Sequence, residues 1–174
     1  MKKQKQLLEG LVGTLEPRIG DTLARVTYSC LEGEIASEAE LRDPQLYIGG
    51  ELLLDFDGGV LVITWDENTG WPDDFSIFIG TNSPIREEAK RDIWDASKLP
   101  VWKKCVNNPL SKVVILGENH TPQAAVLEFS EHTVAVGSGY QHLFGSGDDL
   151  LIRDGSGLRG LSAWRKLWVS DRSS

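Results

Sequence analysis

Alternation of apolar and polar residues is clearest between residues 51 and 82, where it predicts three consecutive strands. Every second residue from 52 to 56 is leucine or phenylalanine, which gives a half-buried strand one apolar face. Asp57-Gly58-Gly59 then favours a tight turn, because glycine adopts positive φ without steric penalty. Residues 60–65 and 75–79 continue as the second and third strands, so the stretch predicts a β-meander.

Helical spacing predicts two helices. Leucine and valine recur at three- and four-residue intervals over residues 4–15, which indicates an amphipathic helix that packs on the sheet. Ser83-Pro84 fits a helix start, since serine caps free amides and proline suits the first turn, and we expect this helix to run over residues 83–97. Residues 32–43 are acidic and only weakly periodic, so they predict either a short helix or a loop.

Short β-prone runs occupy most of the remaining chain. The predicted extended segments are 23–30, 101–106, 112–116, 124–129, 133–136 and 150–152, and a tryptophan-bearing element spans 161–169. The pattern therefore predicts an α+β fold that is mainly antiparallel β. A chain of 174 residues fits a single domain over residues 1–174.

Four sequence matches relate the two halves of the chain in the same order. Residues 54–63 match 127–136 at an offset of 73, residues 73–77 match 148–152 at an offset of 75, 23–26 match 110–113, and 99–104 match 161–166. A diverged tandem duplication of residues 23–106 and 110–169 accounts for these matches, and chance similarity between meanders is the alternative. A duplication would place two half-sheets side by side or face to face within one domain.

Negative charge is concentrated in one part of the chain. Residues 32–95 contain 16 acidic and four basic residues, a net charge of −12, whereas the segments before and after each carry +2. Such a field repels nucleic acid and anionic membranes and attracts basic proteins. A solvated, solubilising face is the alternative. The predicted partner-binding residues are Asp55, Asp57, Asp66, Glu67, Trp71, Asp73 and Asp74.

Catalytic and metal-binding motifs are absent from the sequence. His120, His132 and His142 lack the spacing of a metal-binding pair. The carboxylates around Asp55 and Asp73 could hold Mg²⁺ or Ca²⁺, or act as an acid and base pair, but their spacing fits no EF-hand loop. We therefore expect no cofactor, no metal site and no enzymatic activity.

The cysteines and the apolar segments indicate a reducing, aqueous compartment. Cys30 and Cys105 are too sparse for a disulfide framework and lack zinc-ligand spacing, so both are expected to be reduced structural thiols. No window approaches the roughly 20 apolar residues of a membrane span, and residues 1–6 do not begin a signal peptide. A cytoplasmic location is expected.

The acidic stretch ELLLDFDGGVLVITWDENTGWPDD, the chain length and the lack of active-site motifs resemble the cytoplasmic immunity proteins of bacterial polymorphic-toxin and contact-dependent-inhibition systems. This resemblance implies a protein that binds a cognate toxin, often a basic nuclease, and either plugs its active site or grips an adjacent surface. Carboxylates that occupy a groove made for phosphates would compete with nucleic acid. An exposed strand edge could add a toxin strand by β-augmentation.

Two other classes of function fit the same sequence. A small acidic adaptor or peptide-binding protein would present its largest apolar patch away from the acidic stretch. A small carboxylate-based enzyme would need carboxylates and a histidine within hydrogen-bond reach of one another in a cleft.

Overall fold

The computed structural model describes residues 2–35, 37–66, 76–84, 90–118, 121–130, 132–138, 150–155 and 165–171. The helices in these residues are α1 (Lys2–Leu15) and the short 3₁₀ helices η1 (Glu16–Arg18) and η2 (Glu40–Arg42). The strands are β1 (Leu23–Leu31), β2 (Gln45–Ile48), β3 (Glu51–Phe56), β4 (Gly59–Asp66), β5 (Ser76–Gly80), β6 (Arg91–Asp95), β7 (Leu110–Glu118), β8 (Thr121–Phe129), β9 (His132–Ser138), β10 (Leu150–Asp154) and β11 (Arg165–Asp171).

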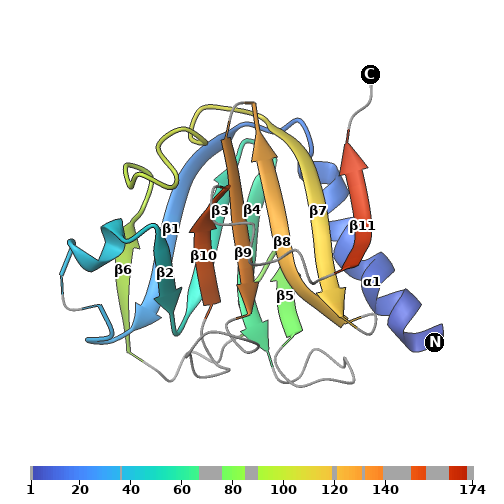
Figure 1. Ribbon diagram of the computed structural model, residues 1–174, viewed down its shortest axis with the longest axis horizontal. Helices are drawn as coiled ribbons and strands as arrows, with labels where there is room; N and C mark the ends of the chain where they lie inside the picture. Colours follow the sequence, from blue (N-terminus) through green and yellow to red (C-terminus); the bar gives the residue numbers. More distant parts are fainter. Residues whose placement is uncertain are drawn as a thin grey trace.

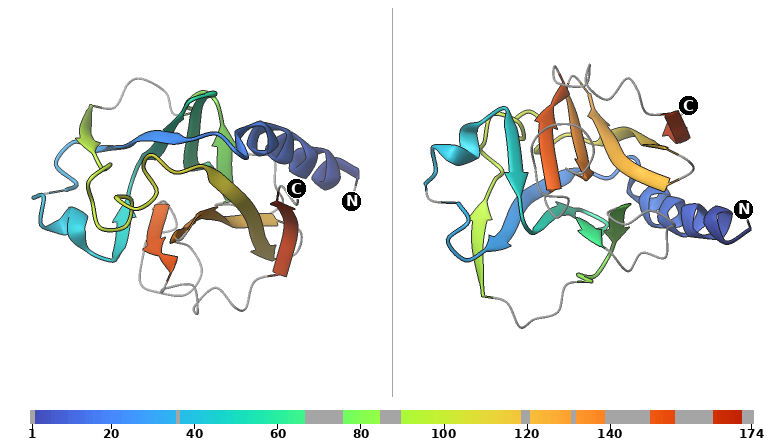
Figure 2. Two further views of the ribbon diagram at one scale, coloured as in Figure 1. Left: turned by 90° about the horizontal axis from the view of Figure 1, so that it is seen from above. Right: turned by 60° about the horizontal axis from the view of Figure 1, so that its bottom comes forward.

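Two antiparallel sheets pack face to face (Figures 1 and 2). The strand order is β5-β4-β3-β1-β6 in the first sheet and β11-β7-β8-β9-β10-β2 in the second. β5 contacts β8 and β4 contacts β9 across the interface, and α1 lies beside β5. The prediction of a mainly antiparallel β fold with an N-terminal helix is confirmed. No helix in the described ranges is long and apolar enough to cross a membrane.

The core consists of side chains from alternate residues along the strands, which point into the space between the two sheets. Leu52 and Leu54 are fully buried on this face of β3, whereas Asp55 between Leu54 and Phe56 is exposed. One apolar cluster joins the inner faces of both sheets to Leu11 and Leu15 of α1. Because each sheet would expose an apolar face without the other, the two sheets are expected to fold as one unit.

Four tryptophans also belong to this core. Trp102 is fully buried, and Trp65, Trp94 and Trp168 are partly buried against the same apolar cluster. Trp164 lies outside the described residues.

Two segments differ from their predicted secondary structure. The helix expected over residues 83–97 is wrong, because Arg91–Asp95 forms β6 and pairs with β1. The apolar spacing that suggested the helix is satisfied instead by sheet pairing, which places Trp94 opposite Tyr28. Residues 101–106, expected to be extended, form successive turns, and the amide of Cys105 donates to the carbonyl of Trp102 at 2.7 Å.

Two other segments are settled by the structure. Residues 32–43 are mostly turns and contain only the single 3₁₀ turn η2. β2 follows Pro44 and has no counterpart among the predicted strands, although it pairs with β10.

The two sheets share one topology. In each sheet, four strands form a meander and a fifth strand returns to pair with the first strand. These strands are β1, β3, β4, β5 and β6 in the first half, and β7, β8, β9, β10 and β11 in the second half. β2 is the exception among the described strands, since it belongs to the first half and joins the edge of the second sheet.

The strand registers repeat as well. Every pair between β3 and β4 has a counterpart between β8 and β9 at an offset of 73. Ile63 pairs with Ile79, and Val136 pairs with Ile152, so the same offset holds one strand further on. The offset of 75 derived from sequence for that strand is therefore wrong by two residues. Trp168 lies opposite β7 where Trp94 lies opposite β1.

The halves also make reciprocal contacts. The amide of Leu23 donates to the carbonyl of Asn108 at 3.1 Å, and the amide of Leu110 donates to the carbonyl of Asp21 at 3.0 Å. Each bond corresponds to the other at an offset of 87, which is the pattern that a two-fold axis between the halves produces. The repeated topology and contacts support a tandem duplication, which stays a prediction.

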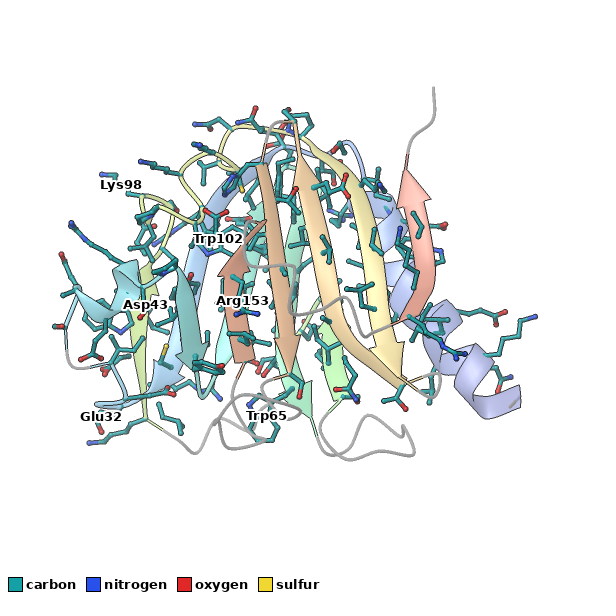
Figure 3. The ribbon with its side chains drawn as sticks, in the orientation of Figure 1. Glu32, Asp43, Trp65, Lys98, Trp102 and Arg153 are labelled. Carbon is teal, nitrogen blue, oxygen red and sulfur yellow. The ribbon has the colours of Figure 1, made fainter. Side chains whose placement is uncertain are left out.

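A buried hydrogen bond ties the turn after β6 to the core of the first sheet. Trp102 Nε1 donates to Tyr28 Oη at 2.6 Å, and both side chains are fully buried (Figure 3 labels Trp102). Burial raises the pKa of Tyr28 well above its usual value, so the phenol stays protonated.

We predict that Tyr28→Phe lowers the free energy of unfolding by about 1–3 kcal/mol, because the buried indole N–H loses its acceptor. Urea denaturation measures this change. The double variant Tyr28→Phe/Trp102→Phe tests its cause, because a double-mutant cycle isolates the pairwise term. Additive losses in that cycle would contradict a direct hydrogen bond between the two side chains.

Candidate functional site

The predicted partner-binding residues do not all lie together. Asp55 and Asp57 are exposed where β3 turns into β4, at one end of the sandwich. Asp66 is the last residue of β4, at the other end of that strand, about 23 Å away at roughly 3.3 Å per residue. Four predicted residues lie outside the described part of the chain: Glu67, Trp71, Asp73 and Asp74.

Cations accompany the two exposed carboxylates near the β3–β4 turn. Arg25 lies directly opposite Asp55 in the ladder between β1 and β3. Arg18 and Asp21 form an ion pair of 3.1 Å that packs against Gly58, where an added Cβ would approach Asp21 to 2.2 Å. The negative field at this end is therefore weaker than the sequence alone indicates.

A second group of carboxylates lies on the exposed segment between β1 and β2. We call this group the acidic flank; it consists of Glu32, Glu38, Glu40 and Asp43, all exposed. Lys90 approaches Glu32 only to 4.0 Å, and both side chains are largely solvent-exposed, so this ion pair neutralises little charge. Figure 3 shows Glu32 and Asp43 on the side of the molecule where β6 and η2 lie.

The carboxylates of Glu34 and Asp92 accept hydrogen bonds that hold the beginning of the segment between β1 and β2 in place. Glu34 accepts a hydrogen bond from the Leu31 amide at 3.3 Å and another from the Gly49 amide. Asp92 of β6 accepts a hydrogen bond from the Gly33 amide at 2.9 Å. The acidic flank is therefore held next to β6.

A pocket of about 540 Å³ lies between η2, β6 and the turn that follows β6. Leu41, Trp94 and Leu99 give it apolar walls. Its basic residues, all exposed, are Arg42, Lys98 and Lys103. Its acidic residues are Glu38 and Asp95.

Asp95 is engaged by the chain itself. The Ser97 amide donates to Asp95 Oδ1 at 3.0 Å, and hydrogen bonds from the Ser97 side chain and backbone hold the pKa of Asp95 below its usual value. The nearby positive charges of Arg25 and Lys98 lower that pKa further. Glu38 is thus the one pocket carboxylate for which the described residues show no hydrogen bond or ion pair.

A buried ion pair anchors β6 to the rest of its sheet. Arg91 Nη1 lies 3.1 Å from Glu51 Oε2 and donates to Ser29 Oγ at 3.2 Å. Ser83 Oγ donates to the other carboxylate oxygen of Glu51. The Glu51 side chain is only 6% exposed and that of Arg91 is 16% exposed, so each group depends on the other for its partner.

Nucleophile and metal chemistry find no support in the described residues. Burial raises the pKa of the Cys30 thiol to about 12, with nearby carboxylates adding to the shift, and burial likewise raises that of Cys105 to about 12. Both cysteines are buried free thiols, which agrees with the predicted structural role. No group of three or more potential metal ligands occurs in the described ranges.

The sequence shows that residues 32–43 are acidic, but it does not show that they lie beside β6. Their position was missed because β6 falls within residues 83–97, which were predicted to form a helix. The basic pocket residues were also missed, since they come from η2 and from a turn far apart in sequence. Comparison with protein-family models, curated proteins and solved structures found no match.

We predict that Glu51→Ala lowers the free energy of unfolding by about 3 kcal/mol, because Arg91 would keep a buried charge without its partner. Glu128→Ala is the matched control. It breaks the more exposed Lys112–Glu128 pair of 3.2 Å and should change the stability by less than about 1 kcal/mol. Equal losses in urea denaturation of the two variants would contradict the role assigned to burial.

We predict that the free energy of unfolding falls at alkaline pH, because Cys30 and Cys105 are buried. Their raised pKa means that the folded state keeps both thiols protonated while the unfolded state ionises them from the ordinary value of 9.0. Their contribution should be complete below pH 9 and be lost as the pH rises towards about 12. Urea denaturation between pH 8 and pH 10.5 should show a steeper fall for this chain than for Cys30→Ala/Cys105→Ala. If the free energy of unfolding fell equally with pH for both chains, the raised pKa of the two thiols would be refuted.

Proposed function

We propose that this chain is an immunity-type inhibitor that binds a cognate basic protein through exposed carboxylates. One observation supports it most: among the acidic side chains described between Glu32 and Asp57, all but Glu51 are exposed. They belong to the part of the chain that carries a net charge of −12. Such a surface attracts a basic partner and raises its association rate.

The binding surface in this proposal has three parts. The first is the pair Asp55 and Asp57 at the β3–β4 turn. The second is the acidic flank, which carries four exposed carboxylates, twice as many as the β3–β4 turn. Asp66, Glu67, Trp71, Asp73 and Asp74 stay in the proposal as a third group that continues from the far end of β4. A basic nuclease is the kind of partner that the family resemblance implies, and a cytoplasmic location goes with it.

A peptide-binding adaptor is the second candidate. The pocket beside β6 favours it, because this pocket combines apolar walls with cations and shares only Glu38 with the acidic flank. Recognition of a peptide there is compatible with inhibition of a toxin, since a toxin can present such a segment.

Charge reversal in matched sets tests the proposed function. The proposal predicts that an adjoining reading frame encodes a basic protein, and that protein is the partner to use. The measurement is its dissociation constant by titration calorimetry at low and high salt. Glu38→Lys/Glu40→Lys should weaken binding at least about tenfold, with Asp55→Lys/Asp57→Lys weakening it less. Salt should weaken binding to the unmodified chain.

Glu9→Lys/Glu16→Lys is the control with the same change in charge, because both residues are exposed on the N-terminal helical segment. It should bind within about twofold of the unmodified chain, since only long-range charge changes. Failure of the adjoining protein to bind, or equal weakening by the control and by Glu38→Lys/Glu40→Lys, would overturn the proposal.

A further inference from the structure

Among the described strands β6 is the last of its sheet, and none of them pairs with the second side of its backbone. The Glu32 amide donates to the Lys90 carbonyl at 3.2 Å, and the Ala96 amide donates to the Val26 carbonyl at 2.9 Å. Hydrogen-bonded pairs alternate along an antiparallel ladder, so Asp92 and Trp94 also bond to β1. The N–H and C=O groups of Ile93 therefore point away from β1, towards the open edge.

Apolar side chains lie on both faces of β6 next to its outer edge. The Ile93 side chain is 64% exposed, which makes it the most exposed large apolar residue described. Trp94 lies on the opposite face of the strand and lines the pocket together with Leu41 and Leu99. An added strand would therefore meet an apolar surface on both of its faces.

The charges at the pocket select the chemistry of the added strand. In the described part of the chain, Arg42, Lys98 and Lys103 take part in no ion pair. Glu38 and Asp95 oppose them with two negative charges, and hydrogen bonds from Ser97 favour the ionised form of Asp95. The three cations exceed the two carboxylates, so the pocket favours an acidic side chain over a basic one.

We propose that an extended segment of a partner protein binds along β6 as an additional strand. It pairs with the backbone of Ile93, inserts an apolar side chain against Trp94 and Leu99, and places an acidic side chain two residues away beside Lys98 and Lys103. Backbone pairing supplies affinity, and the alternate side chains supply specificity. This goes beyond the proposed function, because the site is the edge and pocket of β6, which shares only Glu38 with the acidic flank, and because it does not require a toxin.

The test uses the full chain and a fluorescein-labelled, blocked peptide, Ser-Thr-Leu-Thr-Glu-Thr-Ser, whose leucine and glutamate lie on one face of a strand. A second peptide carries lysine in place of the glutamate. Anisotropy should show saturable binding of the first peptide and at least about tenfold weaker binding of the second. Absence of saturable binding at millimolar peptide, or equal binding of both peptides, would overturn the proposal.

Lys103→Glu and Lys104→Glu form a matched pair of variants. Both residues are exposed, but only Lys103 lines the pocket. Lys103→Glu should weaken binding of the glutamate peptide at least about fivefold, whereas Lys104→Glu should leave it within about twofold. Equal effects would show that net charge, and not the pocket, controls binding.

Ile93→Pro tests the strand pairing itself. Proline removes the outward N–H and is tolerated on an edge strand, so the ladder to β1 should survive. Peptide binding should be lost while the near-ultraviolet circular dichroism is unchanged. Retained binding in the folded variant would rule out pairing along β6, and the Lys103 and Lys104 variants decide the matter if Ile93→Pro fails to fold.

Discussion

One layer of apolar side chains, shared by two sheets, is the constraint on which the described structure depends. Leu54 of β3 and Leu127 of β8 occupy equivalent positions in that layer, and both are fully buried. The rings of Phe56 and Phe129, also equivalent, stack with their centroids 6.5 Å apart. Since each sheet hides the apolar face of the other, neither half is expected to be stable alone. Polar and charged residues therefore lie mainly on the outer faces of the two sheets and at their edges.

Two open sheets have strand edges, and the way each edge is covered differs between the halves. α1 lies beside β5 at one edge of the first sheet. In the second sheet the strand equivalent to β5 is β10, and it is covered by β2, which the first half contributes. No strand in the described ranges pairs with the outer side of β6. Its charged residues Arg91, Asp92 and Asp95 are typical of edges that avoid aggregation, but exposed Ile93 sits among them. Of the partner surfaces proposed above, the acidic flank and the pocket lie beside this edge.

Local sequence patterns predicted the elements that depend on local chemistry. The meander from β3 to β5 and the helix α1 follow from apolar spacing and turn glycines, and Gly59 does adopt a positive φ of 126°. β6 was missed because its residues also fit a helical stripe, and pairing with β1, which is distant in sequence, decides between the two. β2 was missed because its partner β10 lies about a hundred residues away. Asp57 and Asp66 are separated for a related reason, because β4 carries the chain from the β3–β4 turn to the opposite end of the sandwich before Asp66 is reached.

Amide hydrogen exchange along β6 measures most directly whether the outer backbone edge of this strand is open. In the free protein the Ile93 amide should exchange at least about a hundredfold faster than the Trp94 amide, because only the latter bonds to β1. Addition of the glutamate peptide should slow the exchange of Ile93 and leave that of Trp94 nearly unchanged. Equally slow exchange of the two amides in the free protein would show that the edge is already paired, which would contradict the account.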